Sequence, residues 1–115
     1  MAEAKIRCII KRPDETYGHV TNISTTLKNL QNIVGGPIEQ VTIMRETDEH
    51  PGAVVICNEE GKIKGLAPSF RIGYGQVYDI IVGEAIVIGI QGEELVDLPI
   101  SFQTWKQIMY KWGNI

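Results

Sequence analysis

The residues best suited to ligand chemistry surround a glycine-rich segment near residue 75. Arg71 and Tyr78 flank the sequence Gly-Tyr-Gly at 73–75, and Lys62 and Lys64 lie nearby in the sequence. A guanidinium group binds phosphate in a bidentate manner, aromatic rings stack on bases, and glycine lets backbone N–H groups approach an anion. The combination favours a loop that binds a nucleotide-type ligand, although ordinary connections between strands share this composition.

A turn before this segment adds one more candidate. Asn58 begins the sequence Asn-Glu-Glu-Gly at 58–61, where its side chain either reads a polar edge of the ligand or closes the turn. Arginine or lysine would hold phosphate and tyrosine would stack on the base. The expected ligand-binding residues are therefore Asn58, Lys62, Lys64, Arg71, Tyr74 and Tyr78.

Other site chemistry has less support. The two histidines, His19 and His50, are far apart, and no CxxC, HxxxH or HExxH motif occurs, so we expect neither a metal nor a cofactor. Cys57 and His50 flank one expected strand, but nothing orients the imidazole as a base. The glutamate pairs at 59–60 and 93–94 fall at turn tips, where solvated charge is the ordinary explanation. We expect a binding protein and not an enzyme.

Length and charge narrow the class of protein further. The chain has 115 residues, 43% hydrophobic and 22% charged, which fits one globular domain over 1–115. Its net charge of −3 argues against nucleic-acid binding, because proteins that grip a phosphate backbone are usually basic. The first dozen residues are nevertheless basic, which permits a local anion site; they include Lys5, Arg7, Lys11 and Arg12.

The cysteines and the apolar runs indicate where in the cell the protein works. Cys8 and Cys57 lie in apolar runs and are expected to be buried thiols; a disulfide would require neighbouring strands. No hydrophobic leader follows Met1, and the longest apolar stretch, 80–90, is broken and too short to span a bilayer. We expect a cytoplasmic protein with no membrane contact.

The N-terminal half alternates between strands and one helix. Residues 4–12 predict a half-buried strand whose outer face carries Lys5, Arg7, Ile9 and Lys11, followed by a polar loop from Pro13. The segment 25–34 predicts a helix capped by Ser24 or Thr25 and ended by Gly35. Strands are expected over 38–45 and 53–57.

The second half contains less regular patterns. The turn at 58–61 predicts a hairpin whose returning strand covers 62–66, and the segment 67–78 is expected to be irregular. One or two strands follow over 79–90, with a bulge or close approach at Gly83.

A terminal helix completes the expected fold. Its apolar stripe is Leu98, Phe102, Trp105, Met109 and Trp112, with Ser101 as N-cap and Gly113 after its end. This stripe either packs on the sheet or forms a surface for a second copy or a partner. We therefore expect an α+β single domain, with a curled, mostly antiparallel sheet of five or six strands and two packed helices.

Three segments together resemble a known family. They are LKNLQNIVGGPIEQVTI at 27–43, VVICNEEGKIKGLAP at 54–68 and DIIVGEAIVIG at 79–89. The chain is similar over about residues 5–98 to a small domain of unknown function encoded mainly by bacteriophages and mobile elements of Firmicutes. One departure is the sequence Leu-Ala-Pro-Ser at 66–69, where family members usually carry an asparagine, so no role of that asparagine is carried over.

The resemblance implies a setting more than a chemistry. Small phage proteins without enzymatic motifs often inhibit host defence. The resemblance therefore implies that this protein sequesters a nucleotide-type immune signal in the host cytoplasm, as a homo-oligomer. One alternative is a protein–protein inhibitor that masks a host defence enzyme with Phe102, Trp105 and Trp112. Another is a non-catalytic phage accessory module.

Overall fold

A computed structural model describes residues 4–114, apart from the side chain of Tyr74. The larger sheet has six strands in the order β2-β1-β7-β4-β3, with β8 paired to β7, and a separate ribbon is formed by β5 and β6. Every strand pair among the described residues is antiparallel. Together with two helices this confirms the α+β class. The elements are β1 (Ile6–Lys11), β2 (His19–Ile23), α1 (Leu27–Val34), β3 (Ile38–Met44), β4 (Gly52–Asn58), β5 (Pro68–Tyr74), β6 (Val77–Val82), β7 (Ala85–Gln91), β8 (Glu94–Val96) and α2 (Phe102–Lys111).

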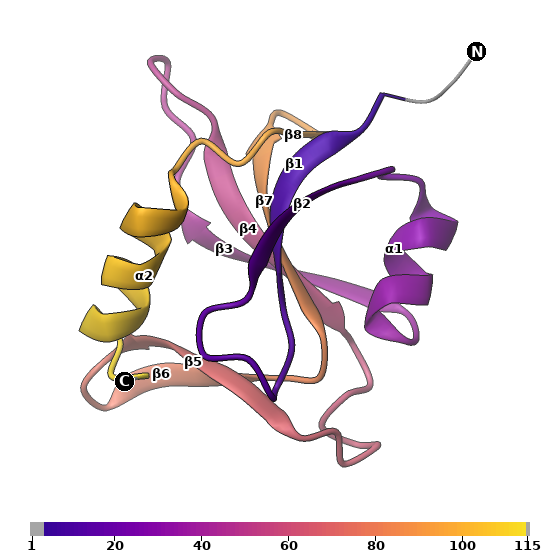
Figure 1. Cartoon of the computed structure of the whole chain (residues 1–115), viewed down its shortest axis with the longest axis vertical. Coiled ribbons are helices and arrows are strands. Elements are labelled where there is room, and N and C mark those ends of the chain that lie inside the picture. Colours follow the sequence, from indigo (N-terminus) through magenta and orange to yellow (C-terminus); the bar gives the residue numbers. More distant parts are fainter. Residues whose placement is uncertain (1–3, 115) are drawn as a thin grey trace.

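The two helices cover opposite faces of the larger sheet (Figure 1). Side chains alternate between the faces of a strand, so β1, β4 and β7 each contribute to two cores. Ile10, Val54 and Ile86 pack on the side of α1, whereas Ile9, Val55 and Val87 pack on the side of α2 and the ribbon. Every residue of β4 is buried, as expected for a central strand covered on both faces.

Capping residues set the ends of both helices. Thr26 accepts a hydrogen bond from the backbone N–H of Asn29 at 3.2 Å, so the N-cap lies just after the expected Ser24 or Thr25. Gly35 ends α1 with a φ of 84°, the left-handed conformation that favours glycine. Ser101 caps α2 as expected, with the N–H of Thr104 at 3.0 Å.

The stripe of α2 packs into the core of its own chain. Trp105 is fully buried, and its indole N–H donates to the backbone carbonyl of Tyr17 at 2.7 Å. The rings of Phe70, Trp105 and Trp112 form two edge-to-face contacts, with centroid distances of 5.6 and 6.1 Å. The expected packing of this helix against the sheet is confirmed.

The returning strand expected over 62–66 was wrong, and so was the irregular segment expected over 67–78. β4 is paired on both edges, with β3 and β7, so no hairpin partner has an edge to join. Residues 59–65 instead form consecutive turns, and the chain then pairs β5 with β6 around Gly75. The polar loop expected after Pro13 was too long, because β2 begins at His19 and pairs with β1.

The basic outer face expected for the first strand was also wrong. Ile9 is fully buried and Lys11 is only 1% exposed, because α2 and the ribbon cover the face that holds Ile9. Arg7 donates through Nη1 to the carbonyls of Leu98 and Ile100, so it holds the segment that leads into α2. β1 therefore lacks the solvated basic face that was expected for it.

Both thiols are buried and free, as expected. Cys8 and Cys57 lie in separate cores on opposite faces of the sheet, and β7 lies between their strands. Burial is the main cause that raises the pKa of each thiol to about 11.

Candidate ligand-binding site

Arg71 and Tyr78 lie on the outer face of the β5–β6 ribbon and contact one another. Arg71 faces Ile80 and Gly73 faces Tyr78, so the tyrosine ring lies over a position without a side chain. The guanidinium carbon of Arg71 lies 4.1 Å from the centroid of the Tyr78 ring, in a cation–π contact. Among the expected ligand residues whose side chains are described, Arg71 and Tyr78 contact one another, and Asn58 and Lys62 line a separate small cavity of about 60 Å³.

Glycine at position 73 is required by this arrangement. Its φ is 96°, and a Cβ there would lie 2.5 Å from the carbonyl oxygen of Val77. The ribbon then turns at Gly75, whose carbonyl accepts a hydrogen bond from Nη2 of Arg71. The Gly-Tyr-Gly sequence is therefore the tip of a tight hairpin that positions the arginine.

The guanidinium of Arg71 retains unused hydrogen-bonding capacity. Its Nε is buried and has no partner among the described residues. A buried N–H without a partner costs free energy. Tyr78 is 53% exposed, so part of its ring surface is open to solvent.

An open depression lies beside this pair. Its volume is about 380 Å³, and its walls come from Thr42 and Ile43 of β3, Ile72 and Gly73 of β5, residues 77–79 of β6, and Trp112, whereas Arg71 does not line it. A neighbouring recess of about 240 Å³ shares Ile43 and Trp112 and is otherwise lined by residues that include Met44, Ile100 and Ile108. Small-molecule sites commonly have volumes of roughly 300–1,000 Å³ and mostly apolar walls.

Asn114 fixes the backbone of β5 under the arginine. Its side-chain Oδ1 accepts from the N–H of Arg71 at 2.7 Å, and its Nδ2 donates to the carbonyl of Arg71 at 2.9 Å. The amide thus bonds to the edge of β5 that faces away from β6. The same Nδ2 donates to the carbonyl of Met109 at 3.2 Å, which links the ribbon to α2.

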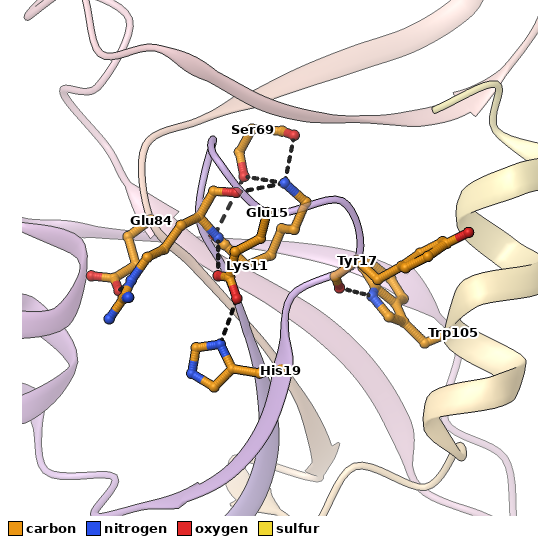
Figure 2. A network of polar contacts seen from close by, with 8 residues as sticks. Lys11, Glu15, Tyr17, His19, Ser69, Glu84 and Trp105 are labelled. Carbon is orange, nitrogen blue, oxygen red and sulfur yellow. Dashed lines mark hydrogen bonds and ion pairs between the residues drawn. The ribbon is translucent and has the colours of Figure 1, made fainter. Parts of the chain in front are cut away.

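A second anchor fixes the start of the ribbon (Figure 2). The ammonium group of Lys11 donates to the carbonyls of Arg12 at 2.6 Å and of Ser69 at 3.0 Å. Burial lowers the pKa of Lys11, and the charges of Glu15 and Asp14 act against that shift. With the hydroxyl oxygen of Ser69 at 3.5 Å, three oxygen atoms replace the water that this buried ammonium group has lost.

The loop between β1 and β2 is held by a carboxylate. Glu15 accepts from the N–H of Arg12 at 3.0 Å and contacts Nδ1 of His19 at 2.8 Å, and these hydrogen bonds outweigh burial and lower the pKa of its carboxyl group. Arg12 in turn pairs with Glu84 at 2.7 Å. The loop carries Tyr17 to the indole of Trp105, so the network supports the core beneath the ribbon.

Lys62 and Lys64 are paired with carboxylates and do not join Arg71. Lys62 lies 2.7 Å from Asp79, a hydrogen bond that raises the pKa of the lysine and lowers that of the aspartate. Lys64 lies 3.4 Å from Glu60. Asp79 alternates with Tyr78 along β6, so the Lys62 pair lies on the opposite face of the ribbon from the Arg71–Tyr78 pair.

Asn58 has a structural role and is only 6% exposed. Its Nδ2 donates to the carbonyl of Val34 at 3.3 Å, and its Oδ1 accepts from the N–H of Glu60 at 2.8 Å. It closes its turn, which was one of the two roles expected for it. The side chain of Tyr74 lies outside the described part of the chain, and its backbone pairs with Val77.

Sequence reasoning missed the residues that complete the site. Thr42, Ile43 and Trp112 line the depression beside Tyr78, and Asn114 bonds to Arg71. All four are brought there only by the tertiary fold. None carries a local motif for ligand binding. Only the glycine-rich composition of residues 73–75, with Arg71 and Tyr78 beside it, gave a usable signal for this position.

Within residues 4–114 no group of three or more histidine, cysteine, aspartate or glutamate side chains is arranged to hold a metal ion. Within that same range, no helix has the length and apolar character needed to cross a bilayer.

The structure is a small α+β domain with a depression of about 380 Å³ beside the β5–β6 ribbon, which Asn114 and Lys11 hold in place. A family model described as a domain of unknown function (DUF3846) matches residues 6–110, so the chain belongs to that family. No curated protein and no solved structure matches the chain.

Proposed function

We propose that this protein binds a small nucleotide-type ligand in the depression beside Tyr78 and holds it without transforming it. The observation that carries the proposal is the Arg71–Tyr78 contact at 4.1 Å, with a guanidinium Nε that has no partner among the described residues. A base would stack on the exposed part of the Tyr78 ring. Arg71 lies outside the depression, so a phosphate that reached past Gly73 would accept hydrogen bonds from its guanidinium group.

The walls of the depression support an aromatic ligand. Ile43, Val77 and Trp112 supply apolar surface, and Thr42 supplies a hydroxyl group at the same border. Its charged neighbour, Asp79, is paired with Lys62, which reduces its repulsion of a phosphate. Lys62 and Lys64 are therefore proposed to act on the ligand only through the local field and not by direct contact.

The biological role follows from the resemblance to phage-encoded domains. We propose that the protein is made by a bacteriophage, acts in the host cytoplasm and removes a nucleotide immune signal by sequestration. Sequestration needs tight binding and a stable fold, and it needs no catalytic group. The proposed function is therefore binding without catalysis.

A thermal-shift screen tests ligand binding directly. The probes are cyclic dinucleotides, cyclic trinucleotides and ADP-ribose-derived signals, with chromatography of the ligand recovered from the complex. A ligand at a hundred times its dissociation constant stabilises a fold by about 2.7 kcal/mol. Intact ligand supports sequestration, altered ligand identifies an enzyme, and no shift with any probe contradicts nucleotide binding.

Matched variants then place the ligand. Arg71→Ala is expected to abolish binding with the fold intact, because Asn114 holds the backbone of residue 71 and not its side chain. Tyr78→Ala should weaken binding by roughly tenfold or more, through lost stacking of about 1–3 kcal/mol. Tyr110→Ala is the control, since that tyrosine is 69% exposed on α2 and lies outside the depression. Equal affinities of the Arg71 and Tyr110 variants would move the site elsewhere.

The alternative of a protein–protein inhibitor loses its expected contact residues. Trp105 is fully buried and Trp112 is 8% exposed, so neither is available as an exposed anchor. Phe102 is only partly buried and lies 6.5 Å from Tyr17, centroid to centroid. A protein partner would have to use a different surface.

A further inference from the structure

The outer edge of β3 is the longest open edge of the larger sheet. β3 has seven residues and β2, at the opposite edge, has five. Among the described residues, β4 is the only strand that pairs with β3. An open edge offers a row of backbone N–H and C=O groups to another strand.

The direction of these backbone groups follows from the pairing with β4. The N–H of Glu59 donates to the carbonyl of Pro37 at 2.8 Å, so residue 37 points toward β4. Backbone groups of an antiparallel strand alternate between its two edges. The N–H and C=O groups of Ile38, Gln40 and Thr42 therefore point away from β4, into the open side.

The usual protections of an edge strand are sparse along this segment. β3 contains no lysine and no proline, and its one charged residue is Glu39. A bulge at Ile43 disturbs the register near its end, where Thr42 faces Val54 and Met44 faces Ala53. The stretch from Ile38 to Thr42 stays regular and available.

We propose that a second copy of this chain pairs with the open edge of β3, antiparallel and related by a two-fold axis near Val41. In this register Gln40 of one copy faces Thr42 of the other, and both present outward backbone groups. Glu39 faces Ile43, so the two carboxylates do not meet. The strand is thus complementary to itself in hydrogen bonding and in charge.

The pairing also brings the two ligand depressions close together. Thr42 and Ile43 belong both to the edge strand and to the wall of the depression. Val77, which is 85% exposed, lies at that same depression and supplies apolar surface near the axis. The two-fold axis is perpendicular to the joined sheet, so both α2 faces lie on the same side.

The test compares two substitutions at one position. Gln40→Pro removes an outward N–H without removing a hydrogen bond to β4, because proline is tolerated where the N–H faces solvent. Gln40→Ala keeps that N–H. Both are measured without ligand by sedimentation over a range of concentrations, with circular dichroism to show that each folds.

The unmodified protein and Gln40→Ala are expected to form dimers, and Gln40→Pro should raise the dimer dissociation constant by roughly tenfold or more. Hydrogen exchange supplies a second readout, since the Gln40 and Thr42 amides should gain protection as concentration rises. A monomer at all concentrations, or a dimer equally stable in all three proteins, would overturn the proposal. Because no ligand is present, failure here leaves the nucleotide proposal standing.

Discussion

The side chain of Asn58 lies directly against the backbone of Gly36. A Cβ at position 36 would be 2.9 Å from Nδ2 and 3.1 Å from Oδ1 of Asn58. The amide also bonds to Val34 at the end of α1 and to Glu60 in the following turn. The Val-Gly-Gly segment at 34–36 and the Asn-Glu-Glu-Gly segment at 58–61 therefore pack directly against each other.

A double-mutant cycle measures this contact. Gly36→Ala should destabilise the fold by about 1–3 kcal/mol through the clash, and Asn58→Ala by about 1–3 kcal/mol through lost hydrogen bonds. Together they should cost less than the sum, because removal of the amide makes room for the methyl group. Urea denaturation of the four proteins gives the coupling energy. Strict additivity would show that the two residues do not interact.

The buried thiols predict a loss of stability in alkaline solution. The pKa of each thiol is about 11 in the folded chain against an ordinary value of 9.0, so the folded state binds more protons between these values. The stabilisation is complete below pH 9 and is lost as the pH rises toward 11, by an amount on the order of 2–3 kcal/mol for each thiol.

The matched comparison is with Cys8→Ala combined with Cys57→Ala. Lys11 has a lowered pKa and shifts stability in the opposite direction, but it is present in both proteins and cancels in the difference. Urea denaturation at pH 8 and pH 10.5 should show a steeper decline for the unmodified chain. Parallel declines would mean that the thiols ionise freely in the folded state.

The tryptophans predict a protected fluorescence signal. Emission should be blue-shifted and little quenched by iodide, because Trp105 is fully buried and Trp112 nearly so. Trp105→Phe should cost about 1–3 kcal/mol beyond the change in packing, since the carbonyl of Tyr17 loses its donor. Trp112→Phe is the comparison for packing alone. Strong quenching in the folded protein would contradict the buried arrangement.

Asn114 predicts a local effect on the ribbon. Asn114→Ala should destabilise the fold by about 1–3 kcal/mol, because the N–H and C=O of Arg71 and the carbonyl of Met109 lose their partner. The Arg71 amide should then exchange with solvent much faster. Asn32→Ala, at an exposed position of α1, is the control. An unchanged exchange rate at Arg71 would show that the amide is not held by this contact.

Local patterns predicted the helices and the central strands well. The α2 stripe, the Ser101 cap and the Gly35 stop are set by neighbouring residues, so they are visible in the sequence. The strand expected at 62–66 was wrong because strand pairing depends on which edges are free in the final sheet, and the second edge of β4 pairs with β7. That competition has no local signal.

The residues of the candidate site also fall into those that were recognisable from local sequence and those that were not. Arg71, Tyr78 and the Gly-Tyr-Gly segment were recognisable as a group because they are neighbours in the sequence, but the segment was expected to be irregular and instead forms a hairpin. Lys62, Lys64 and Asn58 were assigned to the ligand from proximity in sequence, but side-chain alternation and burial direct them elsewhere. Asn114 and Thr42 required knowledge of which distant segments meet.

The position of β7 in the sheet also governs when the protein can fold on the ribosome. β7 lies between β1 and β4, and it pairs Ile9 with Val87 and Val55 with the same Val87. A nascent chain that has emerged only as far as β6 therefore holds two hydrophobic strands whose shared partner is still inside the exit tunnel. The sheet cannot close until β7 has emerged, and until then the β1 and β4 edges are open to aggregation.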